Sequence, residues 1–111
     1  MRRFTVEVAG PAIADLDEIY SYDASVMPPA RAGKLVARLE AAIQALAHAP
    51  ERGPHPPELL ALGVQAYRQI VRPPFRIVYR VRDRSVYVLL VADGRRDMRR
   101  LLESRLFSPS V

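Results

Sequence analysis

Residues 64–93 read VQAYRQIVRPPFRIVYRVRDRSVYVLLVAD, and this stretch decides the fold. It contains three runs rich in β-branched and aromatic residues, over 64–72, 75–82 and 85–93. The connections between the runs, Pro73-Pro74 and Asp83-Arg84, are short enough to join antiparallel strands. Residues 86–91 are apolar at every position, as in a central strand covered on both faces. We therefore predict a three-stranded antiparallel meander.

Upstream of the meander, the apolar pattern predicts one strand and then two helices. Phe4, Val6 and Val8 alternate with other residues, which is typical of a half-buried strand. After Gly10-Pro11, apolar residues recur at helical spacing, first at Ile13, Leu16, Ile19 and Tyr20. A second helical stripe, over 30–49, contains Leu35, Val36, Leu39, Ala42, Ile43 and Leu46. The short connection Met27-Pro28-Pro29 favours an antiparallel helical hairpin.

The remaining segments complete a β-α-α-β-β-β-α order. Residues 50–57 form a proline-rich loop, and a helical turn over 58–62 is expected to end at Gly63. A short amphipathic C-terminal helix is expected from the spacing of Met98, Leu101, Leu102 and Arg105. We predict a single α+β domain over 1–111, in which the second helix packs against the meander near Ile77, Tyr79 and Val88.

Composition narrows the possible functions. The 111 residues include no cysteine, which excludes disulfides, thiol nucleophiles and thiolate metal sites. No stretch is long and apolar enough for a membrane span, and no signal-peptide core follows Met1. His48 and His55 have no carboxylates at metal-binding spacing beside them, and we interpret both as surface residues. We expect a cytoplasmic protein that binds no cofactor or metal.

Charge is distributed unevenly along the chain. Residues 1–60 carry 6 basic and 8 acidic side chains, whereas residues 61–111 carry 11 basic and 4 acidic ones. Every basic residue except Lys34 is arginine, whose planar guanidinium suits phosphates and carboxylates. A basic second half indicates an acidic partner, either nucleic acid or an acidic protein segment.

Strand alternation divides the arginines of the meander into sets. Arg76 and Arg80 point to one side of their strand, and Arg68 and Arg72 share a side of the neighbouring strand. If these sides coincide, Arg68, Arg72, Arg76 and Arg80 form a basic patch on one sheet face, with the helical hairpin on the other. Arg95, Arg96, Arg99 and Arg100 would then border the patch. The alternative is a solvated surface with local ion pairs to Asp83, Asp93, Asp97 and Glu103.

The acidic residues of the first helix have a simpler interpretation. Asp15, Asp17, Glu18 and Asp23 are expected to form a solvated helix face and not a catalytic carboxylate pair.

Several short motifs together resemble the RelE/ParE family of toxins from type II toxin–antitoxin systems. They are Ala14-Asp15-Leu16-Asp17-Glu18-Ile19-Tyr20, Pro50-Glu51-Arg52-Gly53, Tyr67-Arg68-Gln69-Ile70, Phe75-Arg76-Ile77-Val78-Tyr79-Arg80-Val81 and Gly94-Arg95-Arg96-Asp97. The resemblance implies a growth-inhibiting toxin that forms a hetero-oligomer with a ParD-like antitoxin, whose acidic C-terminal segment wraps around it. It also implies a role in plasmid stabilisation.

The family has two branches. RelE-like members cleave messenger RNA on the ribosome, and ParE-like members inhibit DNA gyrase. The resemblance places Arg68, Arg76 and Arg96 on the cationic positions of the RNase and Leu102 on the position of its tyrosine. No histidine or tyrosine follows Tyr87, and arginine is a poor proton-transfer group. We therefore favour the ParE branch, which is not an enzyme, with Arg95, Arg96, Arg99 and Arg100 as the target-facing surface. Tyr67 or Tyr79 could act as a base, so the RNase remains the alternative.

A second alternative is a stand-alone nucleic-acid-binding module. The basic patch supports it, but the meander is expected to lack the exposed aromatic pairs on which single-stranded bases stack.

Overall fold

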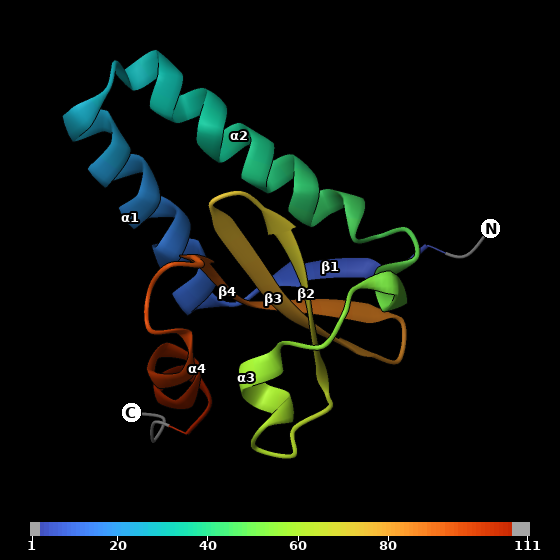
Figure 1. Ribbon diagram of the computed structural model, residues 1–111. Helices are drawn as coiled ribbons and strands as arrows, with labels where there is room; N and C mark the ends of the chain where they lie inside the picture. Colours follow the sequence, from blue (N-terminus) through green and yellow to red (C-terminus); the bar gives the residue numbers. More distant parts are fainter. Residues whose placement is uncertain (1–2, 108–111) are drawn as a thin grey trace.

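The computed structural model describes residues 3–107 and confirms the α+β fold (Figure 1). The chain forms the following elements in order: β1 (Thr5–Val8), α1 (Gly10–Val26), α2 (Pro29–Ala45), a 3-10 turn (Pro50–Arg52), α3 (Pro57–Leu60), β2 (Tyr67–Arg72), β3 (Phe75–Arg82), β4 (Ser85–Asp93) and α4 (Met98–Phe107). No helix within the described residues is long and apolar enough to cross a membrane.

The sheet has the strand order β1-β4-β3-β2. The strands β2, β3 and β4 form the predicted antiparallel meander, and β1 pairs in parallel with β4. This order makes β4 an inner strand, which explains its continuous apolar run. The helical hairpin covers one face of the sheet, and α3 and α4 lie on the other (Figure 1).

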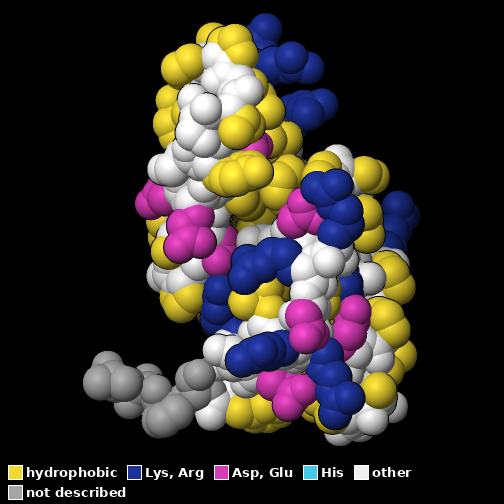
Figure 2. Space-filling model, turned by 60° about the vertical axis from the view of Figure 1, so that its left-hand side comes forward, with side chains coloured by type: hydrophobic (Ala, Val, Ile, Leu, Met, Phe, Trp, Pro, Cys, Tyr) yellow, Lys and Arg dark blue, Asp and Glu magenta, His cyan; other side chains and the backbone are white. Residues whose placement is uncertain are grey.

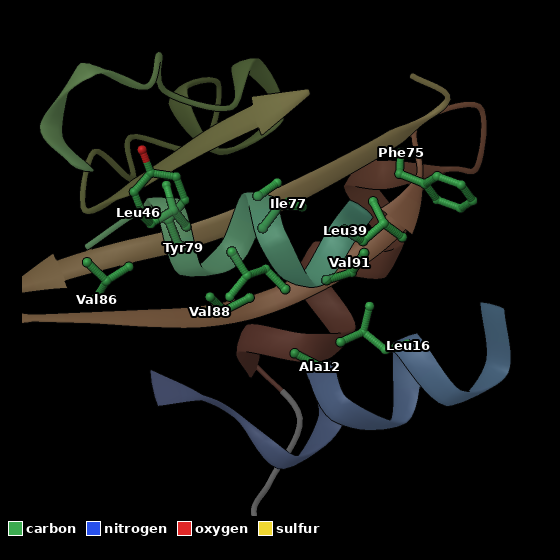
Figure 3. Close-up of a cluster of buried hydrophobic side chains, with 12 residues drawn as sticks. Ala12, Leu16, Leu39, Leu46, Phe75, Ile77, Tyr79, Val86, Val88 and Val91 are labelled. Atoms are coloured by element: carbon green, nitrogen blue, oxygen red, sulfur yellow. The ribbon is translucent and has the colours of Figure 1, made fainter. Parts of the chain in front are cut away.

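The larger core lies between the hairpin and the sheet. Leu39, Ile43 and Leu46 of α2 and its C-terminal end pack against Ile77 and Tyr79, as predicted, together with other side chains shown in Figure 3. From α1, the buried contributors are Ala12 and Leu16, whereas Ile13 and Tyr20 are exposed. The buried face of α1 is therefore rotated away from the predicted stripe, because the small Ala12 and not Ile13 meets the sheet.

A smaller core lies on the opposite face. Leu59 of α3 and Met98 and Leu102 of α4 pack on Val78, Leu90 and Ala92. Arg76 connects α3 to the sheet on this side, since its guanidinium donates two hydrogen bonds of 2.7–2.8 Å to Glu58 and two more to Gln69. These hydrogen bonds from Arg76 hold the pKa of Glu58 below its usual value.

The ends of two elements differ from the sequence-based prediction. The strand expected over 64–72 begins at Tyr67, because Gly63 adopts a left-handed φ of 77° and the Val64 amide donates to the Leu59 carbonyl, closing the end of α3. The helix expected over 30–49 ends at Ala45, and Ala49 adopts a φ of 50° before the proline-rich loop.

The prediction that Asp15 faces water is wrong. Asp15 is buried on α1, although Asp17 and Glu18 beside it are exposed. Its carboxylate accepts hydrogen bonds from the Val91 amide and from the Arg105 guanidinium of α4, which also donates to the Leu89 carbonyl. A β-bulge near Leu89 accompanies this arrangement, because Val78 pairs with Leu90 while Tyr79 pairs with Val88. One carboxylate therefore joins α1, β4 and α4.

We expect the substitution Arg105→Met to lower the free energy of unfolding by about 3 kcal/mol, because it leaves a buried carboxylate with only one backbone donor. Arg99→Met is the matched control on the same helix. It removes an exposed ion pair to Glu103, and we expect it to cost less than about 0.5 kcal/mol. Urea unfolding followed by circular dichroism measures both changes. Equal losses in the two variants would contradict the role assigned to Asp15 and Arg105.

The ion pair between Arg76 and Glu58 predicts a pH dependence. A carboxyl group whose pKa is lower in the folded chain stabilises the fold above its unfolded pKa and stops doing so as the pH falls through its folded pKa. We expect Glu58→Gln to be less stable than the unchanged protein at neutral pH, and the difference to shrink as the pH falls below the ordinary pKa of a glutamate side chain. Unfolding by urea between about pH 3 and pH 7 measures this, with the exposed Glu51→Gln as control. A difference that is constant across this range would refute it.

Candidate functional site

The four arginines expected to share one sheet face are divided between both faces. In the β2–β3 ladder, Arg68 is paired with Tyr79 and Arg72 with Phe75, so both point toward the hairpin side. Arg76 and Arg80 are paired with Val71 and Tyr67 and point to the other side. The prediction of a single basic face over Arg68, Arg72, Arg76 and Arg80 is therefore wrong, because the register of the two strands differs from the one assumed.

Arg68 belongs to a set of contacts that fixes the proline-rich loop. Its guanidinium donates 2.8 Å to the Gly53 carbonyl, and the Tyr79 hydroxyl donates 2.5 Å to the Pro50 carbonyl. Gly53 must be glycine here, since a Cβ would lie 2.4 Å from the Tyr79 hydroxyl oxygen. In Figure 3 the hydroxyl of Tyr79 points away from the buried cluster. Burial raises the pKa of Tyr79, which makes it a poor base near neutral pH.

The same loop covers part of the outer edge of β2. The Gln69 amide donates to the Pro54 carbonyl, and Nδ1 of His55 lies 2.8 Å from the Tyr67 carbonyl oxygen. His55 is thus a half-buried structural residue and His48 an exposed one. Within the described residues, this loop thus occupies the Gln69 amide and the Tyr67 carbonyl on the outer edge of β2, and the Val71 carbonyl accepts from the Arg72 guanidinium.

The arginines after β4 lie on the surface, as predicted. Arg95 forms an ion pair of 2.6 Å with Asp93, and its hydrogen bonds to this carboxylate lower the pKa of Asp93 to about 2. Arg99 forms an ion pair with Glu103 at 3.0 Å. Arg96 and Arg100 are exposed and form no ion pair among residues 3–107. The local ion pairs that we weighed as an alternative therefore account for two of these four arginines.

The three RNase candidates do not converge on one point. Arg68 faces the hairpin side, Arg76 is held by Glu58 on the opposite face, and Arg96 lies in the exposed loop before α4. Leu102, which the resemblance placed on the position of the RNase tyrosine, is fully buried between α4 and the sheet. Within the described residues, no group of three or more histidines and carboxylates could hold a metal ion.

A cleft of about 690 Å³ separates the helical hairpin from the end of the sheet. Its apolar lining includes Ile19, Tyr22, Met27, Leu35 and Phe75, and its charged lining includes Glu18, Asp23, Arg38, Arg95 and Arg96. Figure 2 shows hydrophobic side chains in a hollow whose margins carry both basic and acidic side chains. Tyr22 is 68% exposed. An aromatic residue outside the predicted apolar stripe of the first helix is the sequence signal that could have indicated this cleft.

A second feature was missed altogether. Tyr67, Arg80 and Tyr87 stand in one row across β2, β3 and β4 and point to the face that carries α3 and α4. Only Tyr87 of these two tyrosines is exposed, since Tyr67 is half-buried and packs against the smaller core, so the row contains no exposed aromatic pair. The tyrosines come from different strands, and only the register aligns them.

Comparisons with known proteins agree with this architecture. Among curated proteins, none matches the chain at a significant level. A chain of the chromosomal ParDE toxin–antitoxin system from P. aeruginosa superposes with a TM-score of 0.70 at 22% sequence identity, covering 82% of this chain and 96% of that one. A chain of the toxin–antitoxin complex RelBE2 from Mycobacterium tuberculosis gives a TM-score of 0.56 at 26% identity, covering 84% of this chain and 93% of that one.

The sequence itself assigns the family. Residues 6–98 match the family described as the ParE toxin of the type II toxin–antitoxin system parDE. The match spans β1 to the start of α4, so it includes the hairpin, the whole meander and the loop with Arg95 and Arg96. This chain belongs to the ParE toxin family of type II toxin–antitoxin systems.

Proposed function

We propose that this toxin inhibits DNA gyrase and does not cleave RNA. The observation that carries the proposal is the divergence of Arg68, Arg76 and Arg96, combined with the burial of Leu102. Metal-independent RNA cleavage requires a base, an acid and cations that converge on one phosphate. Here the first two arginines bind carbonyl and carboxylate groups of the protein itself, on opposite faces of the sheet.

The proposed target-facing surface consists of Arg95, Arg96, Arg99 and Arg100. All four are exposed on the loop before α4 and on its first turn, next to one another along the chain. Arg96 and Arg100 have no ion pair among the described residues, so their guanidinium groups are available to an acidic surface of the target.

The antitoxin is proposed to occupy the cleft between the hairpin and the sheet. The aromatic ring of Tyr22 and the side chain of Leu35 offer apolar contacts, and Arg38, Arg95 and Arg96 offer partners for acidic side chains. An acidic ParD-like segment with apolar anchors suits both features. The partly covered edge of β2 supports binding in the cleft more than addition of a strand there. In this proposal, the toxin is neutralised in the cytoplasm as a complex with this antitoxin.

The proposed target can be tested with purified components. We expect the protein to inhibit DNA supercoiling by gyrase and to leave ribosome-bound message intact. The double substitution Arg99→Glu/Arg100→Glu should weaken inhibition about tenfold or more, because it reverses charge at the target-facing surface without touching the core. The control Arg31→Glu/Lys34→Glu makes the same charge change on α2 and should inhibit normally. Cleavage of message in a reconstituted translation system, with supercoiling unaffected, would establish the RelE-like activity instead.

The proposed antitoxin site predicts a large effect from one exposed ring. We expect Tyr22→Ala to weaken binding of the cognate antitoxin by roughly 10-fold to 100-fold, because aromatic anchors dominate such interfaces. Tyr20→Ala is the matched control, since Tyr20 lies on the same helix but does not line the cleft. Isothermal titration calorimetry measures both affinities. If the two variants bind the antitoxin equally well, the segment does not occupy this cleft.

A further inference from the structure

The row formed by Tyr67, Arg80 and Tyr87 runs from the smaller core, against which Tyr67 packs, to an exposed part of the sheet at Tyr87. On this face, α3 and α4 pack on Val78, Leu90 and Ala92, toward the start of β3 and the end of β4 (Figure 1). Arg80 and Tyr87 lie beyond these three residues, near the turn that joins β3 to β4. Tyr87 is 38% exposed there, and Thr5 and Glu7 on the neighbouring strand β1 are also exposed. The Tyr87 end of the row is therefore open to a ligand.

Arg80 is held by an aromatic ring and not by a carboxylate. The carbon at the centre of its guanidinium lies 5.5 Å from the centroid of the Tyr67 ring, within the range of a cation–π interaction. Its Nε is buried without a hydrogen-bond partner, and among residues 3–107 it forms no salt bridge. Glu7 faces the same side but is paired with Tyr87, one strand further away. The outer nitrogens of Arg80 remain available to an anion.

The two tyrosines flank this cation at a useful distance. Neighbouring strands lie about 4.8 Å apart, so Tyr67 and Tyr87 are separated by roughly 10 Å with Arg80 between them. The exposed Arg82, two residues further along β3, extends the positive charge on the same side. Arg80 offers a contact for a phosphate, and the exposed Tyr87 beside it offers a ring for a base.

We propose that Arg80 and Tyr87 bind single-stranded nucleic acid, with a base stacked on Tyr87 and the adjacent phosphate on Arg80, whose guanidinium is held by the ring of Tyr67. An acidic peptide would use the charge of Arg80 but would gain little from the ring of Tyr87, which is why an exposed ring beside the cation favours a nucleic acid. The proposal is independent of gyrase inhibition, because binding is measured with the toxin alone. It also differs from RNA cleavage: Tyr67 was weighed as a base for that reaction, but the three cationic candidates Arg68, Arg76 and Arg96 lie outside the row.

Fluorescence anisotropy with a labelled oligothymidylate of about ten nucleotides tests the proposal on the full chain. We expect Arg80→Met and Tyr87→Leu each to weaken binding roughly tenfold, and Tyr87→Phe, which keeps the ring, to change it less than about twofold. Arg31→Met removes the same charge from α2 and should have a similarly small effect. Arg80 and Tyr87 lie on different strands, and circular dichroism of each variant separates loss of folding from loss of the site.

Several results would overturn the inference. Absence of binding by the unchanged protein would do so. Equal losses of affinity in Arg80→Met and Arg31→Met, with no effect of Tyr87→Leu, would also do so, because this result indicates general attraction of the oligonucleotide to a basic protein. Displacement of the oligonucleotide by an oligoglutamate peptide, with the same sensitivity to Tyr87→Leu, would identify a peptide surface. Parallel titrations with oligouridylate and duplex DNA separate the sources. Preference for either single strand over the duplex supports the proposal, and the preferred strand identifies RNA or DNA.

Discussion

The architecture depends on which groups hydrogen-bond to the backbone of β4 beyond the point where β1 ends. β4 has nine residues and β1 only four, so β4 continues beyond its parallel partner. A buried amide or carbonyl without a partner is costly, and side chains replace the missing strand: Asp15 accepts from the Val91 amide and Arg105 donates to the Leu89 carbonyl. Asp15 and Arg105 also form a salt bridge with each other. Together these side-chain contacts hold both α1 and α4 against the sheet.

Arginine serves three different purposes in the basic half of this chain. Arg68, Arg76 and Arg105 bind backbone carbonyls or carboxylates and join segments that are distant in sequence. Arg95 and Arg99 form exposed ion pairs, which contribute little to stability. Arg80, Arg96 and Arg100 have no acidic partner within residues 3–107, and they carry the proposals about binding. Net charge therefore indicated an acidic partner, but only the contacts distinguish binding arginines from structural ones.

Much of the fold could be predicted from the sequence, because periodicity reports burial directly. The stripe of Leu39, Ile43 and Leu46 and the apolar run of β4 specified the hairpin, the meander and the inner strand. The candidate site was less accessible, since which side chains meet depends on strand register. Alternation correctly predicted which arginines share a side within β2 and within β3. The register between the two strands, however, places Arg68 and Arg76 on opposite faces. The burial of Asp15 depends on Arg105, 90 residues away, and no local pattern encodes such a pair.

The bond between Asp15 and Arg105 also has a consequence for synthesis of the protein. Ribosomes make the chain from its N-terminus, and α1 leaves the ribosome long before the codon for Arg105 is read. Until Arg105 is available, the carboxylate of Asp15 and the carbonyl of Leu89 lack these hydrogen bonds and must be hydrated. The surface around Arg95 to Arg100 belongs to the same late segment as Arg105, so the contacts that fix α1 and the target-facing surface are completed together at the end of synthesis.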